Sequence, residues 1–464
     1  MRLGFLAPLL LAAGCASVGP DYVRPEVPVN PDWLQSELQQ FETSPAELAE
    51  WWRVLDDPVL NDLIATAIER NNGIRIAGLR ILEAQANLNI ATGNRYPQAQ
   101  VIAGDASITD TGDLTIEQYN LGASLSWEID FWGRFRRGIE AADASYLATV
   151  ASYDDTMVLV TATVADAYVV IRATEEQLRL ANDSLALQQR SYEIVDVLFR
   201  NGSSAELDAL QARTLLLSTE ATIPELEATL RKAKNALSVL LGAAPAEMQQ
   251  VFKGDGEPPT VPTSIAVGLP ADLLRQRPDI RKAELQAMAQ NALVGVATAN
   301  LYPSFSLTGF LGASSTEYDS GNSIIDDFLS SDGGALSLGA NFVWPFLNYG
   351  RIRSNIDVQD ARLQQALIAY QETVIQGARE AEDAMASLSN TRAKHVILTE
   401  SVTVAQRSAD LAFLRYREGF ADYQRVLDAQ QALFAQQQRY AANRGDVVRS
   451  VIKLYRSLGG GWQQ

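Results

Sequence analysis

The stretch "YNLGASLSWEIDFWGRFRR", residues 119–137, contains a change of hydrophobic period that decides the fold. From Tyr119 to Trp127, apolar side chains alternate with small or polar ones, as in a β-strand with one apolar face. After Gly133 the alternation stops, and residues 138–201 contain no proline and almost no glycine. At 1.5 Å per residue, this segment predicts one helix on the order of 100 Å long.

The same pattern is written a second time further along the chain. Trp127 and Gly133 recur as Trp344 and Gly350, 217 positions later, and many further residues keep this offset. The Tyr-Pro pair at 96–97 recurs at 302–303, only 206 positions later, which leaves one insertion of 11 residues in a Gly/Ser/Asp-rich loop. A constant offset over this length indicates two copies of one unit, each with a helix, a strand pair and a long helical hairpin.

The long helices carry the spacing of a coiled coil. A second one is predicted over residues 351–418, and in the first the apolar residues fall at every seventh position. No other segment is large enough to bury such helices, so they need one another or other subunits. His395, the single histidine, falls on this seam in the second copy and is expected to be a packing or solvated residue rather than a catalytic one. The heptad positions of the first copy are Ile171, Leu178, Leu185, Tyr192 and Phe199.

The two strand pairs, expected at about 98–128 and 304–346, have the length of tilted membrane strands. Aromatic residues gather at one end of them, where an interfacial girdle would lie. A half-buried sheet in a soluble domain has the same periodicity, so this alternative stays open from periodicity alone. The girdle candidates are Trp127, Trp132, Trp344 and Phe346.

The N-terminus favours the membrane interpretation. Arg2 precedes an apolar run of signal-peptide length that ends in Leu-Ala-Ala-Gly-Cys, the pattern of a bacterial lipoprotein signal. Cleavage before Cys15, the only cysteine, would leave it to carry covalent lipid, with residues 1–14 removed. Ala16 follows rather than an aspartate, so we expect the outer membrane as the destination.

Composition narrows the function classes. The formal net charge is −18, or −19 once Arg2 is removed with the signal, which disfavours nucleic acid as a partner. Walker-type phosphate loops, nucleophile elbows and paired metal ligands are absent from the sequence, so enzymatic activity and a cofactor are not expected.

Glu128 and Asp130, which lie beside Arg134 and Arg136, are predicted to pair and to orient the bend between strand and helix.

The turns of the helical hairpins are predicted at two glycines. Gly202 and Gly419 suit the left-handed residue that ends a helix, and Ser203 with Glu206 forms a predicted capping box.

The predicted organisation follows the repeats. The expected parts are a signal peptide at 1–14, a lipid-anchored segment at 15–57, a first repeat at 58–251, a Pro/Gly-rich linker at 252–279 and a second repeat at 280–464.

Four strands per chain have a consequence for assembly. Open strand edges cannot be left in lipid, so closure requires several chains. Two chains would give eight strands and an interior filled by side chains, whereas three would give twelve strands and a lumen. The long helices would then continue this lumen as a tube.

The sequence resembles the TolC/OprM-type outer-membrane efflux factors, in their lipoprotein (NodT-like) branch. The resemblance covers essentially the whole mature chain and rests on "GCASVGPDYVRPEVPV", "WWRVLDDPVLNDLIATAIERN", "LSWEIDFWGRFRR", "GLPADLLRQRPDIRKAE" and "LRYREGFADYQRVLDAQ". It implies a mainly α fold with a membrane β-barrel: a homotrimer with a twelve-stranded barrel, a twelve-helix periplasmic tunnel and a mixed belt. It also implies a periplasmic adaptor and an inner-membrane RND-type pump as partners.

The resemblance also suggests where the duct closes. It places a constricting aspartate at Asp428, which would set an acidic field attractive to cations, while a leucine common in the family is replaced by Gln424. Tyr416, with Asp208 as candidate partner, would tether the closed state, and Arg425 belongs to the same candidate gate. Candidate adaptor contacts at the hairpin tips are Arg200, Gly202, Ser203, Arg417 and Gly419.

The function expected from these features is a passive exit duct in the outer membrane for drugs or other small toxic molecules, gated at its periplasmic tip. A duct for type I protein secretion would have the same architecture with another inner-membrane partner. A periplasmic adaptor would have one hairpin and many short strands, and a structural coiled-coil lipoprotein would leave the alternating strands unexplained. The duplication and the strands favour the duct.

Overall fold

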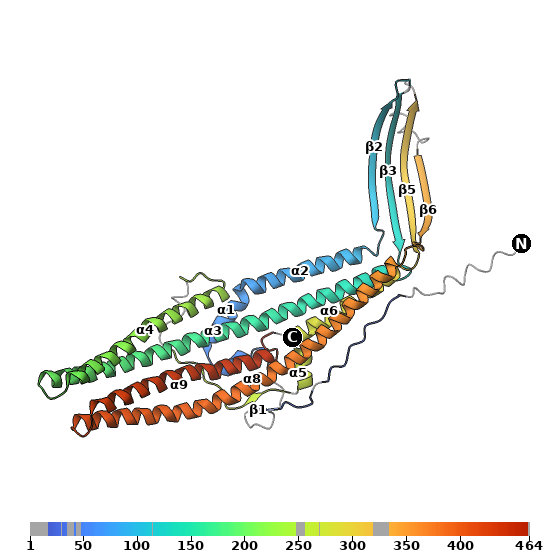
Figure 1. Ribbon diagram of the computed structural model, residues 1–464. Helices are drawn as coiled ribbons and strands as arrows, with labels where there is room; N and C mark the ends of the chain where they lie inside the picture. The colour runs from blue at the N-terminus through green and yellow to red at the C-terminus, as the bar shows by residue number, and fades with distance from the viewer. Residues whose placement is uncertain are drawn as a thin grey trace. The chain divides into compact units, whose positions relative to one another are not determined.

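A computed structural model describes residues 17–28, 30–34, 41–42, 48–113, 115–246, 256–268, 270–318 and 334–462, without the side chains of 271–273 and 315–318. The predicted signal peptide, Cys15 and most of the inserted loop lie outside these residues. The described chain is mainly helical, with one four-stranded sheet (Figure 1).

The helices and strands follow the predicted duplicated order. The helices are η1 (Trp51–Leu55), α1 (Pro58–Arg70), α2 (Asn72–Gly93), α3 (Arg134–Arg200), α4 (Glu206–Leu240), α5 (Pro270–Gln276), α6 (Pro278–Ala299), α8 (Arg351–Arg417) and α9 (Tyr423–Ser457). The strands are β1 (Phe41–Glu42), β2 (Ala99–Asp110), β3 (Thr115–Ile129), β4 (Ile265–Ala266), β5 (Ser304–Tyr318) and β6 (Gly334–Val343). Helices α3 and α8 both contain 67 residues, which confirms the predicted length of about 100 Å for each.

Two compact units make up the chain, and each takes residues from both repeats. Unit 1 contains residues 1–26, 80–150 and 282–372, and unit 2 contains residues 27–79, 151–281 and 373–464. The boundaries expected from the sequence describe repeats along the chain and stay a prediction. Each unit is described separately below.

Unit 1 contains an antiparallel sheet in the order β2-β3-β5-β6, so the two strand pairs of the repeats lie side by side (Figure 1). The register joins Asn120 to Asp105 on one side and to Ser314 on the other. Because side chains alternate along each strand, this register gathers most of the large aliphatic residues on one face of the sheet, the apolar face, and mostly small or polar residues on the other, the polar face.

The apolar face has no core against it among the described residues. Ile102 is 81% exposed and Leu338 is 80% exposed. A contiguous exposed apolar surface of this kind marks a membrane or protein contact. The residues of this face include Ile102, Leu121, Leu125, Trp127, Leu307, Leu311, Leu336, Leu338 and Phe342.

The bend from β3 to α3 is held as the sequence predicted. The Asp130 carboxylate accepts hydrogen bonds from the backbone N–H groups of Phe135 and Arg136, at 3.0 and 2.8 Å, and so satisfies the start of α3. Glu128 pairs with Arg134 at 2.7 Å. The second copy has Pro345 and Leu347 at the equivalent positions, so its bend uses other contacts.

Unit 2 contains α4 and α9 together with residues 151–200 of α3 and 373–417 of α8, which form two helical hairpins, α3 with α4 and α8 with α9 (Figure 1). An 18-residue window of α3 is long and apolar enough to cross a membrane, but 56% of it is buried inside the protein, as in a core helix. Gly202 and Gly419 have φ values of 73° and 79°, which confirms the left-handed turns at the hairpin tips.

One local prediction in unit 2 is wrong. The N-cap of α4 is Ala205, without a side-chain cap, so Ser203 and Glu206 form no capping box; Ser204 instead bonds Asp208 at 2.8 Å. The segment 252–279, predicted as a Pro/Gly-rich linker, contains α5 and a strand, β4, that pairs with β1. Within this segment, the buried Arg277 donates to the Ser457 carbonyl at 2.6 Å and to the Asp279 carboxylate at 2.7 Å.

Candidate functional site

Three tryptophans fasten the base of the sheet in unit 1. The indole N–H of Trp127 donates to the Arg95 carbonyl at 3.2 Å, and that of Trp344 donates to the Leu301 carbonyl at 3.0 Å. These two bonds occupy equivalent positions in the two repeats. Each one ties the C-terminal end of a strand that returns to the base of the sheet, β3 or β6, to the turn that leads into its partner strand, β2 or β5.

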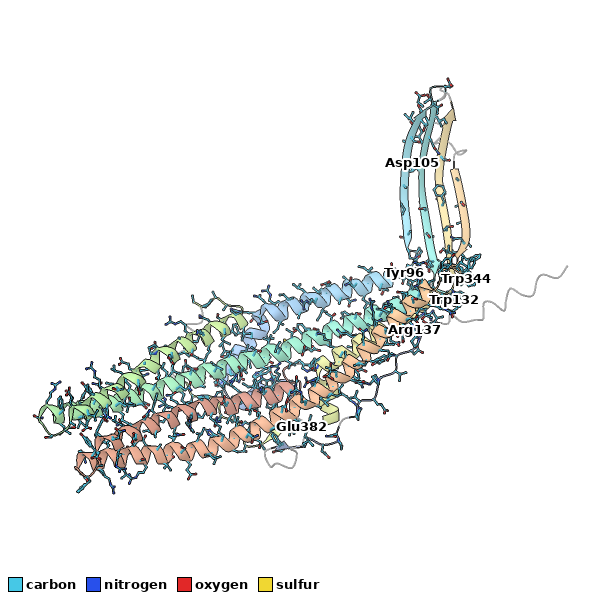
Figure 2. The ribbon with its side chains drawn as sticks, in the orientation of Figure 1. Tyr96, Asp105, Trp132, Arg137, Trp344 and Glu382 are labelled. Atoms are coloured by element: carbon cyan, nitrogen blue, oxygen red, sulfur yellow. The ribbon has the colours of Figure 1, made fainter. Side chains whose placement is uncertain are left out.

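Trp132 adds a third fastening at the same end. Its N–H donates to the Pro303 carbonyl at 2.9 Å, and its ring stacks on Tyr302 at 4.4 Å. Figure 2 shows Tyr96, Trp132 and Trp344 gathered where the sheet meets the helices. Phe346 lies 6.2 Å from Trp344, largely exposed. An amphipathic ring with its N–H satisfied suits a membrane–water boundary, although the girdle role itself stays a prediction.

Both edges of the sheet are open. The described residues give β2 and β6 no partner on their outer sides. Each edge therefore presents a row of backbone N–H and C=O groups that must pair elsewhere in a bilayer.

The N-terminal segment, residues 17–26, is docked on unit 1 by a residue that the sequence did not single out. Arg137 has a side chain only 6% exposed, and it donates to the Asp21 carboxylate at 2.7 Å and to the carbonyls of Val18 and Gly19. Arg137 lies within the "RFRR" motif, but spacing alone gives no sign of what it binds. The docked segment begins two residues after Cys15.

The tip of unit 2 holds the candidate gate residues. Tyr416 lies against Tyr423 with ring centroids 5.0 Å apart, and both belong to a small apolar cluster formed by α3, α4, α8 and α9. Burial raises the pKa of the Tyr423 hydroxyl, and the neighbouring Tyr416 and Asp208 raise it further. The structure therefore brings Asp208 and Tyr416 to the same buried tyrosine, which sequence reasoning missed.

The constriction candidates lie on the exposed face of α9. Gln424 donates from its amide nitrogen to the Asp428 carboxylate at 2.9 Å, one helical turn away. Arg425 is exposed on the same turn. The five gate residues are thus near one another at this tip, and their role stays a prediction.

The hairpin tips carry the predicted adaptor-contact residues. Arg200 pairs with Asp196 at 2.7 Å, while Gly202, Ser203, Arg417 and Gly419 are exposed. Phe420 is 79% exposed beside Gly419, a large apolar side chain that the sequence reading did not pick out.

A buried charge network crosses unit 2. The Tyr168 hydroxyl donates to Asp57 at 2.7 Å and accepts from Arg172, which pairs with Glu175 at 2.9 Å. Lys234 of α4 completes the network at Glu175. Burial raises the pKa of Tyr168 to about 12. Among the described residues, no three His, Cys, Asp or Glu side chains are grouped to hold a metal ion.

The whole chain matches known proteins. The sequence profile of the outer membrane efflux protein family matches residues 63–243 and 269–460. The chain belongs to this family. The solved structure of the outer-membrane channel OprN has a TM-score of 0.89 and 31% identity to it, over 96% of this chain and 100% of that one.

Two relatives of this outer membrane efflux protein have names that state a location or a function. The probable outer membrane lipoprotein SilC of Salmonella typhimurium is 32% identical over 478 residues, covering 100% of this chain and 99% of that protein. The toluene efflux pump outer membrane protein TtgF of Pseudomonas putida is 31% identical, covering 100% and 98%. The predicted family, fold class, outer-membrane location and efflux function are confirmed: this protein is an outer-membrane efflux channel.

Proposed function

We propose that three copies of this chain close their sheets into one twelve-stranded barrel. The observation that carries this proposal is the four-stranded sheet with an exposed apolar face and two open edges, β2 and β6. In lipid, each edge must pair, and the antiparallel alternation of the strands continues when β2 of one copy meets β6 of the next. The apolar face then meets lipid and the polar face lines a lumen.

The helices of the three copies form the periplasmic tunnel in this assembly. Each copy supplies two hairpins, so three copies supply twelve helix arms around one passage. The mature N-terminus carries lipid on Cys15 and is held on unit 1 by Arg137. The lipid aids delivery and steadies the trimer, while the barrel itself spans the outer membrane.

The cargo is a drug or another small toxic molecule that moves passively through the duct. Support comes from TtgF, whose name assigns it to a toluene efflux pump. The energy comes from an inner-membrane RND-type pump, which reaches the channel through a periplasmic adaptor. The adaptor contacts the hairpin tips at Arg200, Gly202, Ser203, Arg417 and Gly419, and Asp428 with its neighbours closes the passage.

Mass and conductance test the assembly. In detergent, light scattering should give the mass of three chains, and planar bilayers should show ion conductance. A monomer that is silent in bilayers would overturn the proposal.

Deletion in the host tests the cargo. Loss of the protein should sensitise cells to toxic small molecules, and crosslinking in the same cells should capture an adaptor and an RND-type pump. Loss of a secreted protein instead, with a type I secretion partner captured, would reassign the duct to protein export.

A further inference from the structure

One carboxylate stands on the polar face of the sheet away from its base. Asp105 of β2 lies in register with Asn120 of β3, which lies in register with Ser314 of β5. The Asn120 amide nitrogen donates to the Asp105 carboxylate at 3.0 Å. Figure 2 shows Asp105 on β2, well away from the base of the sheet that Trp132 marks.

Among the described residues, Asp105 is the only charged one on this face above the base of the sheet. Glu128 shares the face, but it lies at the base and is neutralised by Arg134 at 2.7 Å. Among the described residues, Asp105 has no ion pair, and its side-chain hydrogen-bond partner is the neutral Asn120. The other described residues of this face are small, polar and uncharged, or apolar.

The next row of residues in register on the polar face does not cover the Asp105 carboxylate. Gly122 and Gly312 lie in register in that row, flanked by Ala103 and Ala335. The Phe310 ring covers the two glycines, and a side chain at Gly312 would come within 2.6 Å of it. The Phe310 ring is therefore seated on the sheet rather than extended across the face.

We propose that Asp105 sets the charge selectivity of the barrel, as a ring of three carboxylates that favours cations, inorganic or organic, over anions. This inference rests on the proposed trimer, whose closure turns the polar face inward. Three like charges around one water-filled passage raise the local concentration of cations and lower that of anions. The Asn120 amide holds each carboxylate on the lumen wall.

The ionic strength decides at which salt concentrations the charge selectivity of this ring can be measured. The Debye length is about 30 Å at 0.01 M salt and about 8 Å at 0.15 M, so a ring at the wall of a wide barrel acts across the passage chiefly in dilute salt. Selectivity due to Asp105 should therefore be strong in dilute potassium chloride and weak in concentrated salt.

The test compares two isosteric variants in planar bilayers under a potassium chloride gradient. Asp105→Asn removes the charge and keeps an oxygen that accepts the Asn120 bond. Glu117→Gln is the matched control, because it removes the same charge from β3 on the apolar face. At about 0.01 M salt, Asp105→Asn should lower the potassium-to-chloride permeability ratio at least about twofold, and Glu117→Gln should leave it unchanged.

The outcomes separate this inference from the proposed function. A variant that conducts with an unaltered permeability ratio at low salt overturns the role of Asp105 and leaves the trimeric channel intact. Absence of conductance from the unmodified protein overturns the channel itself. Asp105→Lys supplies a second check, because a reversed charge should move the ratio further toward chloride than Asp105→Asn does.

Discussion

The guanidinium of Arg137 lies 2.7 Å from the carboxylate of Asp21, and it joins the first helical turns of α3 to an N-terminal segment that has no secondary structure of its own over residues 17–28. The same side chain donates to the carbonyls of Val18 and Gly19. Asn291 of α6 adds a bond to the Pro20 carbonyl at 2.9 Å. Residues from both repeats thus hold this segment in unit 1.

Replacing Arg137 should release the segment. Arg137→Ala removes donors to two carbonyls and two carboxylates, which we expect to cost about 2 kcal/mol locally, or roughly 30-fold faster amide exchange. The measurement is hydrogen exchange at Val18, whose N–H donates to the Trp132 carbonyl at 3.1 Å. Arg179→Ala, which breaks an exposed pair with Asp183 on the same helix, is the control. Unchanged protection at Val18 would contradict the docking role.

The repeated architecture was predictable because its signals are local and periodic. Alternation around Leu121 and Leu338 gives the strands, the long runs without proline give α3 and α8, and the constant offset relates one copy to the other. Even the bend at Glu128 and Asp130 was predictable, because its partners lie within eight residues.

The contacts that the sequence did not reveal join distant segments. Arg137 meets Asp21 across more than a hundred residues, and Tyr168 meets Asp57 in the same way. A single sequence contains no period that pairs such residues. The capping box failed for a different reason: Ser203 lies in the turn that Gly202 makes, so α4 begins too late for its hydroxyl to cap the helix.

Asp428 provides the prediction about gating. Three copies of this exposed carboxylate on α9 would narrow the passage and hold cations there, so Asp428→Ala should raise single-channel conductance about twofold or ease opening, and should reduce cation selectivity. Glu418→Ala, an exposed carboxylate at the turn of the same hairpin, is the control. Conductance and selectivity that match the unmodified channel would remove Asp428 from the gate.

Tyr168 makes stability depend on alkaline pH. Its pKa is about 12 when folded against a reference value of 10.0, so the unfolded chain loses this proton first. Stability from this group is fully present below pH 10 and is lost as the pH rises toward 12, with a slope of at most about 1.4 kcal/mol per pH unit. Urea unfolding at several pH values should show the decline.

The variant Tyr168→Phe isolates this contribution. It removes the hydroxyl that bonds Asp57 and Arg172, which should cost about 1–2 kcal/mol at neutral pH, and its alkaline decline should be shallower than that of the unmodified protein. Tyr349→Phe, at a highly exposed tyrosine, is the control and should leave both quantities unchanged. Equal alkaline slopes for Tyr168→Phe and the unmodified protein would contradict the raised pKa.

Cys15 tests which part of the molecule holds it in the membrane. Ser17 already packs against Gly133 at the base of the sheet, so any lipid on Cys15 is attached close to strands that we expect to span the bilayer by themselves. With a cleavable secretory signal supplied, Cys15→Ala should therefore still yield a membrane-embedded trimer, measured by membrane fractionation and crosslinking. In the same background, Leu121→Lys places a charge on the apolar face, where a lysine near the bilayer centre costs about 2–4 kcal/mol. This variant should reduce insertion into the membrane. Asn120→Lys, on the polar face, is the control and should leave insertion unchanged. Recovery of Cys15→Ala as a soluble periplasmic protein would show that lipid, and not the sheet, holds the chain in the membrane.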